Sequence, residues 1–155
     1  MKPKKLTLIS ITLLAILLIG AGVVVVLSQK PVGANVKWDP KGYTWRDGAP
    51  DPWNAEIGLK GGHKAQTEIN ATTIRLEGQY SNSSAIYNAT HGPRIIVPFN
   101  GNDVKAALDS KLPYHMGSAI PGRYRLSLDI NGTLYTGEEF QGSGIIVVTV
   151  PEDSG

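Results

Sequence analysis

The longest apolar stretch of the chain runs from Leu6 to Leu27 and contains no charged residue. As an α-helix it would be roughly 33 Å long, enough to cross the roughly 30 Å hydrocarbon core of a bilayer. Three lysines precede it with no acidic residue nearby, so the positive-inside rule assigns residues 1–5 to the cytoplasm. The pattern therefore predicts a transmembrane helix over residues 6–28, with the rest of the chain facing outward.

The same run has a second interpretation, as a secretory signal peptide that is removed. Such a peptide has a basic start, an apolar core of about 7–15 residues and a small-residue cleavage site. The basic start is present, and Val32-Gly33-Ala34 could serve for cleavage. The apolar core is longer than usual, however, and Lys30 and Pro31 separate it from that site. These features favour a retained anchor over a cleaved signal.

Residues 29–53 are rich in proline and glycine, which disfavour a helix because proline fixes φ and lacks a backbone donor. The segment also holds the aromatic residues Trp38, Tyr43, Trp45 and Trp53, which a purely solvated tether would not need. These side chains either pack onto the following domain or the membrane interface, or they form a contact surface for a partner. The sequence thus predicts a Pro/Gly/Trp-rich arm before a domain that covers residues 54–155.

From residue 54 onward, short runs of alternating apolar and polar residues are separated by turn residues. The clearest run covers residues 123–130, where Tyr124, Leu126, Leu128 and Ile130 alternate with polar neighbours. A period of two marks a strand with one buried face and one face in water. Comparable runs predict further strands at residues 55–59, 72–78, 94–99 and 144–150.

Two local signals connect these strands. Asn131-Gly132 directly follows the 123–130 strand and predicts a two-residue hairpin turn, because both residue types tolerate positive φ; the return strand would cover residues 133–135. A short helix is expected at residues 103–110 with Asn102 as its N-cap. The elements together predict a mainly β domain, an antiparallel immunoglobulin-like β-sandwich with one short helix.

Three segments of this domain carry a family resemblance. Residues 69–78 read INATTIRLEG, residues 95–108 combine IIVPF with the helix-forming DVKAAL, and residues 124–150 end in FQGSG and IIVVTV. In this order they resemble the small immunoglobulin-like β-sandwich modules that accompany dockerin, protease or adhesin domains in secreted bacterial and archaeal proteins. The resemblance spans about residues 55–150 and implies a fold and an extracytoplasmic compartment. Members often carry aspartate where this chain has Gly144, and the sequence lacks the dockerin calcium loop.

Charge separates the two parts of the chain. The formal net charge is +2, but Lys2, Lys4, Lys5 and Lys30 supply four of the 15 basic residues. That leaves 11 basic against 13 acidic residues beyond residue 30, a net charge of −2. Without a basic patch to hold a phosphate backbone, nucleic acid is not an expected partner. The chain has no cysteine, so its stability must come from strand pairing and core burial.

No catalytic or metal-binding pattern emerges from the sequence, and we expect no cofactor and no small-molecule substrate. His63, His91 and His115 lie in turn-rich segments without metal-ligand spacing. The chain lacks a cysteine nucleophile and a G-x-S-x-G elbow. Asp39, Asp47 and Asp51 could share a calcium ion, but their spacing is not that of a calcium loop. The sequence therefore favours a protein that is not an enzyme.

One pattern exceeds chance: four N-x-S/T sequons lie on the predicted outer side of the membrane, at Asn70, Asn82, Asn88 and Asn131. Sequons mark exposed loops of secreted chains. We therefore expect a glycoprotein from a host that glycosylates its surface proteins, such as an archaeon.

Two functions fit these features. The first is a cell-surface protein, anchored through residues 6–28, that acts in adhesion, in envelope structure or as an accessory subunit of a membrane complex. The alternative is a secreted filament subunit whose N-terminal arm adds as a strand to the sheet of the next subunit. Alternation in the arm is broken early by Pro40, which cannot donate to a ladder, so self-assembly ranks second.

Overall fold

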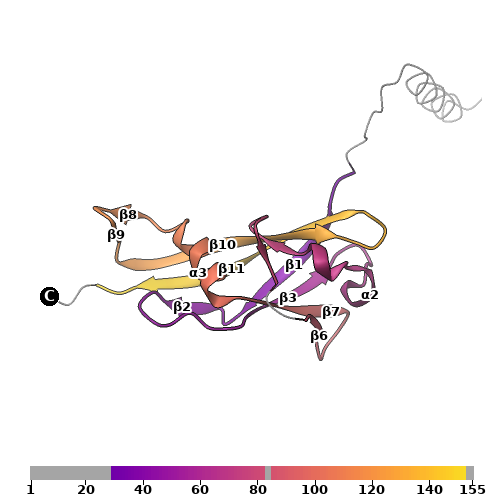
Figure 1. Ribbon diagram of the computed structural model, residues 1–155, viewed down its shortest axis with the longest axis horizontal. Coiled ribbons are helices and arrows are strands. Elements are labelled where there is room, and N and C mark those ends of the chain that lie inside the picture. Colours follow the sequence, from indigo (N-terminus) through magenta and orange to yellow (C-terminus); the bar gives the residue numbers. More distant parts are fainter. Residues whose placement is uncertain (1–28, 83–84, 153–155) are drawn as a thin grey trace, which may run out of the picture.

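The computed structural model describes residues 29–82 and 85–152 and shows a mainly β structure (Figure 1). The predicted transmembrane helix at residues 6–28 and the basic tail at residues 1–5 lie outside the described residues. Within the described ranges, no helix is long and apolar enough to cross a membrane.

Nine of the described strands form one sheet in the order β5-β4-β10-β11-β1-β3-β7-β6, with β2 also paired to β11, and a separate hairpin joins β8 and β9. The helical elements are α2 (Ala65–Glu68), the 3₁₀ turn η1 (Ala71–Thr73) and α3 (Gly101–Asp109). The strands are β1 (Val32–Asp39), β2 (Gly42–Thr44), β3 (Trp53–Leu59), β4 (Arg75–Leu76), β5 (Tyr80–Ser81), β6 (Tyr87–Asn88), β7 (Arg94–Phe99), β8 (Tyr114–His115), β9 (Ser118–Ala119), β10 (Gly122–Thr133) and β11 (Glu139–Val150).

β1 lies in the middle of the sheet, parallel to β11 along one edge and antiparallel to β3 along the other. Ala34, Val36 and Trp38 are buried, whereas Asn35 and Lys37 between them are exposed. The structure thus differs from the predicted arm, because residues 29–53 contribute β1 and β2 to the sheet that the later strands form. It also differs from a purely antiparallel sheet, since β1 and β2 both run parallel to β11.

Two glycines of β11 leave room for β1. A Cβ atom at Gly142 would lie 2.4 Å from the backbone oxygen of Ala34, and one at Gly144 would lie 2.8 Å from Nε1 of Trp38. Real Cβ atoms essentially never approach other atoms this closely. The close packing of Trp38 against β11 therefore requires Gly144, the position at which the resembled modules often carry aspartate.

The sheet curls around a single core. An isolated bridge between Asn82 and Phe99 brings the chain just beyond β5 against β7, although these strands lie far apart in the sheet order. The rings of Trp38 and Phe99 pack with their centroids 5.9 Å apart, and α3 adds Val104 and Leu108 to the core. The largest fully buried side chains are Trp38, Trp53, Phe99, Phe140, Ile57, Ile74, Leu76, Ile95, Leu108, Leu128, Ile130 and Leu134.

Several predicted elements are confirmed. Strands cover residues 55–59, 94–99 and 123–130, and the predicted alternation holds along β10. Leu128 and Ile130 are fully buried there, whereas Tyr124 and Leu126 are only partly buried. The predicted helix exists as α3, but it starts earlier, and its N-cap is Asn100, whose Oδ1 accepts from the Asn102 backbone N–H at 2.9 Å.

The predicted hairpin turn at Asn131-Gly132 is wrong. Both residues lie within β10, which continues to Thr133 and pairs along its whole length with β11. The turn falls later, where Leu134 N–H donates to the Glu138 oxygen at 2.8 Å and Gly137 has a φ of +90°. Gly132 is required for another reason, because a Cβ there would lie 2.7 Å from the Phe140 ring. Likewise, the predicted strand at residues 72–78 is reduced to β4, preceded by η1.

The molecule is elongated, and its two ends differ (Figure 1). β1 begins at one end, beside α2 and the β10–β11 turn. The start of β10, the end of β11, β2 and the β8–β9 hairpin lie at the other, which we call the far end. The 12 residues of β10 run between the two ends, a length of roughly 40 Å.

Candidate functional site

The four aromatic residues of the predicted arm are mostly core residues. Trp38, Tyr43 and Trp53 are buried, and only Trp45 is partly exposed. Tyr43 packs edge-on against Trp53 with the ring centroids 5.3 Å apart, and Trp53 Nε1 donates to the Pro40 oxygen at 2.9 Å. These contacts agree with the interpretation in which the aromatics pack onto their own domain. They leave Trp45 as the one member of this group with a side chain that a partner could reach.

The four sequon asparagines are spread over the sheet rather than gathered in one place. Asn88 on β6 and Asn131 on β10 are exposed, whereas Asn70 and Asn82 are half-buried. The Oδ1 atom of Asn70 accepts from the hydroxyl of Thr72 at 2.9 Å, so this side chain is held in place by its own sequon. Of the four side chains, those of Asn88 and Asn131 are the most accessible to modification.

The histidines lie apart from one another along the fold. His91 and His115 are exposed, while Nδ1 of His63 lies 2.6 Å from Oε2 of Glu68. The other oxygen of Glu68 accepts from the Lys64 backbone N–H at 2.7 Å. The Lys64 amide, and next the His63 ring, hold the pKa of Glu68 below its usual value. Because this carboxylate closes the first turn of α2, its role is in helix capping.

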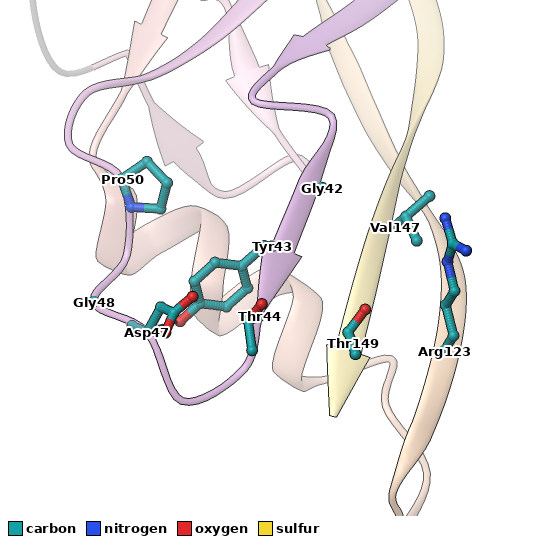
Figure 2. Close-up of a pocket in the computed structure, with 9 residues that line it drawn as sticks. All are labelled: Gly42, Tyr43, Thr44, Asp47, Gly48, Pro50, Arg123, Val147 and Thr149. Atoms are coloured by element: carbon teal, nitrogen blue, oxygen red, sulfur yellow. Dashed lines mark hydrogen bonds between the residues drawn. The ribbon is translucent and has the colours of Figure 1, made fainter. Parts of the chain in front are cut away.

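The described residues contain no group of three or more histidine, aspartate or glutamate side chains that could hold a metal ion. A surface hollow with a volume of about 660 Å³ lies at the far end instead (Figure 2). It lies between the loop that follows β2 and the outer face of β10 and β11, where the outer face is the side of the sheet away from the core.

A row of side chains from three strands forms the floor of this hollow. Thr149 on β11 pairs in register with Thr44 on β2 and with Arg123 on β10. The loop beyond β2 is fixed above them, since the Tyr43 hydroxyl donates to the Asp47 backbone oxygen at 2.6 Å. Lys105 Nζ lies 5.0 Å from the centre of the Trp45 ring and fixes the same loop from α3. Two hydroxyls and a guanidinium suit hydrogen bonding to a polar partner.

A second hollow, of about 490 Å³, lies on the outer face further along the sheet. Gly33 and Gly142 lie in its lining, and Asn131 brings one sequon to it. Polar side chains from β1, β10 and β11 and the loop after β3 complete the lining, namely Asn35, Lys60, Asp129, Gln141 and Ser143.

The edge of β10 facing away from β11 is open at the far end. Among the described residues of β10, β4 pairs with Ile130 and Asn131 alone. Asp129 turns its backbone groups to this edge, because its oxygen accepts from Glu77 N–H and its N–H donates to the Glu77 carboxylate, both at 2.8 Å. Alternate residues of a strand turn their backbone groups to the same edge. Ser127, Arg125 and Arg123 therefore face it as well.

Most of these backbone groups have no partner among the described residues. Lys111 Nζ donates to the Ser127 oxygen at 2.7 Å and to the Glu77 carboxylate at 2.8 Å, and so closes the edge at that point. Beyond Lys111, the part of the chain that the structure describes provides no hydrogen bond to the outward N–H and C=O groups of Arg125 and Arg123. We call this stretch, Arg123 to Ser127, the open edge.

Side chains beside the open edge are also incompletely satisfied. Arg123 and Arg125 are exposed, and in the described ranges their guanidinium groups form no ion pair or hydrogen bond. On the inner face Tyr124 and Leu126 are only partly buried. The β8–β9 hairpin next to them exposes Tyr114 and Met116, the latter at 93%, and Ile120 directly after β9 is exposed as well. The sequence predicted the alternation of β10 but not its open edge, which depends on how short β4 is.

Comparison of the chain with known protein families, with curated proteins and with solved structures finds no match.

Proposed function

We propose that this chain is a non-enzymatic cell-surface protein that is held in the membrane by residues 6–28 and binds a protein partner through its far end. Its role would be adhesion, envelope structure or service as an accessory subunit of a membrane complex. The finer assignment of the fold as an immunoglobulin-like β-sandwich belongs to the same proposal. It is supported by the curl of the sheet and by β1, which links β3 to β11.

The observation that carries this proposal is the position of the apolar run relative to the two ends of the molecule. The run ends at Leu27, and β1 begins only five residues later at Val32. A domain joined to a membrane helix by so short a connection would keep the start of β1 close to the bilayer. The far end, with the larger hollow and the open edge, would then project roughly 40 Å outward.

Glycosylation is part of the same proposal. Asn88 and Asn131 are exposed, and an outward-facing position would give them access to a glycosylating machinery. Mass spectrometry of the protein purified from its native host should find glycan on these two asparagines. Unmodified peptides at both positions would contradict this part of the proposal.

The alternative, a secreted subunit that assembles by strand addition, has less support. Both edges of β1 are occupied within the same chain, by β11 and β3, and Trp38 is buried in the same core. Addition of this segment to another subunit would require β1 to leave its own sheet.

Protease digestion of intact cells tests the proposed topology. Trypsin added outside should cut the exposed lysine and arginine sites of residues 29–152, because this part of the chain would face outward. A cytoplasmic protein in the same cells serves as the control for leakage. Protection of residues 29–152 in intact cells, with digestion after lysis, would overturn the outward orientation. Recovery of the chain in the soluble fraction with a start near Asn35 would favour the secreted alternative.

A further inference from the structure

We propose that the open edge binds an extended segment of another protein, whose side chains alternate between acidic and apolar, as an added β-strand. The inference rests on the proposed binding role of the far end and names the chemistry of the partner. A strand edge with free N–H and C=O groups is a template for a further strand. The open edge offers both groups at Arg123 and Arg125 and the N–H group at Ser127, whose oxygen accepts from Lys111.

The side chains of β10 specify the pattern of the added strand. Residues directly opposite one another on neighbouring strands point to the same face of the sheet. Residues opposite Arg123 and Arg125 would therefore lie on the outer face beside two unpaired guanidinium groups, where carboxylates fit best. Residues opposite Tyr124 and Leu126 would lie on the inner face, where apolar side chains would complete the burial of both.

Neighbouring elements limit the length of the added strand. Lys111 occupies the edge at the Ser127 oxygen, and the Tyr124 hydroxyl donates to the Ile120 oxygen at 2.9 Å where the chain arrives from β9. About five residues of β10 lie between these two contacts, a length of roughly 17 Å. The exposed side chains of Ile120 and Met116 would extend the apolar contact beyond the strand itself.

A second copy of the chain is a poorer occupant of the same edge. An antiparallel pair of two β10 strands centred on Tyr124 would place Arg123 opposite Arg125 of the other copy. A pair centred on Arg125 would place this residue opposite itself. Like charges directly opposite one another destabilise a strand pair, so the charge pattern favours an acidic partner.

The test uses the full chain in micelles of a non-ionic detergent and a fluorescent, capped heptapeptide of alternating glutamate and valine. Matched probes replace each glutamate by lysine, or the central residue by proline. We expect the acidic peptide to bind and both matched peptides to bind at least about ten-fold more weakly, because charge and backbone pairing both contribute. Equal binding of the acidic and the basic peptide would overturn the proposal. So would the absence of binding by the acidic peptide at concentrations up to about 1 mM.

Variants and amide exchange identify the edge. Arg125→Glu should weaken binding of the acidic peptide about ten-fold, whereas Lys37→Glu, an exposed charge on β1, should change it less than about two-fold. Bound peptide should slow hydrogen exchange at the backbone N–H groups of Arg123, Arg125 and Ser127. Exchange at the backbone N–H groups of Tyr124 and Leu126, which face β11, should not change.

The exchange measurement uses the wild-type chain, so it does not depend on whether a variant folds. Unchanged exchange at all three residues with peptide bound would overturn the proposal. Dimerisation that Arg125→Glu abolishes would assign the edge to a second copy instead. The topology test above does not depend on these results, so failure of one proposal can be told from failure of the other.

Discussion

Gly144 shows how one residue without a side chain determines where a neighbouring strand can lie. The indole of Trp38 occupies the space that a Cβ atom of residue 144 would need, and the backbone oxygen of Val36 lies 2.9 Å from the same point. Trp38 and its neighbours are packed on all sides, so they cannot move aside without loss of core contacts. A sequence pattern shows that position 144 is glycine, but the reason lies more than a hundred residues away on β1.

Substitution of Gly144 by alanine should therefore destabilise the protein. We expect a loss of about 1–3 kcal/mol in the free energy of unfolding, because the added methyl group overpacks the core. Urea unfolding of the full chain, followed by tryptophan fluorescence, measures this loss. Gly48→Ala is the matched control, since a Cβ atom there meets no other atom within 4 Å. Equal stability of the two variants would contradict the close contact between β1 and β11.

Glu68 provides a second residue-scale prediction, on pH. Its pKa is lowered by the Lys64 amide and by His63, so its ionised form is stabilised more in the folded chain than in the unfolded chain. The resulting stabilisation is present above the usual carboxyl pKa and is lost as the pH falls through the lowered value. A carbon-13 NMR titration should place the Glu68 midpoint below 4.5, the ordinary value. In Glu68→Gln this part of the pH dependence of stability should disappear, and a midpoint at or above 4.5 would contradict the capping role.

At the scale of elements, alternation along a strand was predictable and the partner of the strand was not. The sequence predicted strands at the positions of β3, β7 and β10, and the alternation along β10, because alternation is a local property. The alternation of Ala34, Val36 and Trp38 is equally regular, yet the prolines and glycines around it favoured an arm. Pairing of β1 with β11 joins residues at opposite ends of the chain, and no local pattern reveals such a pair. The open edge was missed for the same reason.

The position of the β10–β11 turn gives a prediction at this scale. Gly137 has a φ of +90°, which costs a residue with a side chain roughly 1–2 kcal/mol. Gly137→Ala should therefore lower the free energy of unfolding by about this amount, whereas Asn131→Val, at an exposed strand position, should change it by less than about 0.5 kcal/mol. Thermal unfolding of the two variants measures both values. The opposite order would place the turn at Asn131-Gly132.

At the scale of the whole molecule, the described residues from 29 to 152 share one main sheet and one core, without a division between an arm and a domain. β1 holds together the two halves of the sheet, because β11 and β3 pair with it on opposite edges. The buried aromatics Trp38, Tyr43 and Trp53 come from the segment that the sequence set apart. The N-terminal segment and the last strand therefore belong to the same cooperative unit.

A truncated chain that starts at residue 54 should consequently fail to fold. The truncation removes β1, β2 and the first residue of β3, and with them the core side chains of Trp38, Tyr43 and Trp53. It also exposes the edges of β3 and β11 that pair with the lost strands. We expect no cooperative thermal transition by circular dichroism, in contrast to a chain that starts at residue 29. A cooperative transition of the shorter chain would show that residues 54–152 form a unit by themselves.

The placement of β1 also determines how the molecule would bear tension. A pull on the chain before Val32 acts along β1, and the hydrogen bonds to β11 and β3 lie across that direction. The ladders on both sides are then loaded in shear, so that many bonds share the force and must break together. A terminal strand peeled from an edge would lose its bonds one at a time. A protein tethered through residue 29 and held at its far end would therefore resist extension along its long axis.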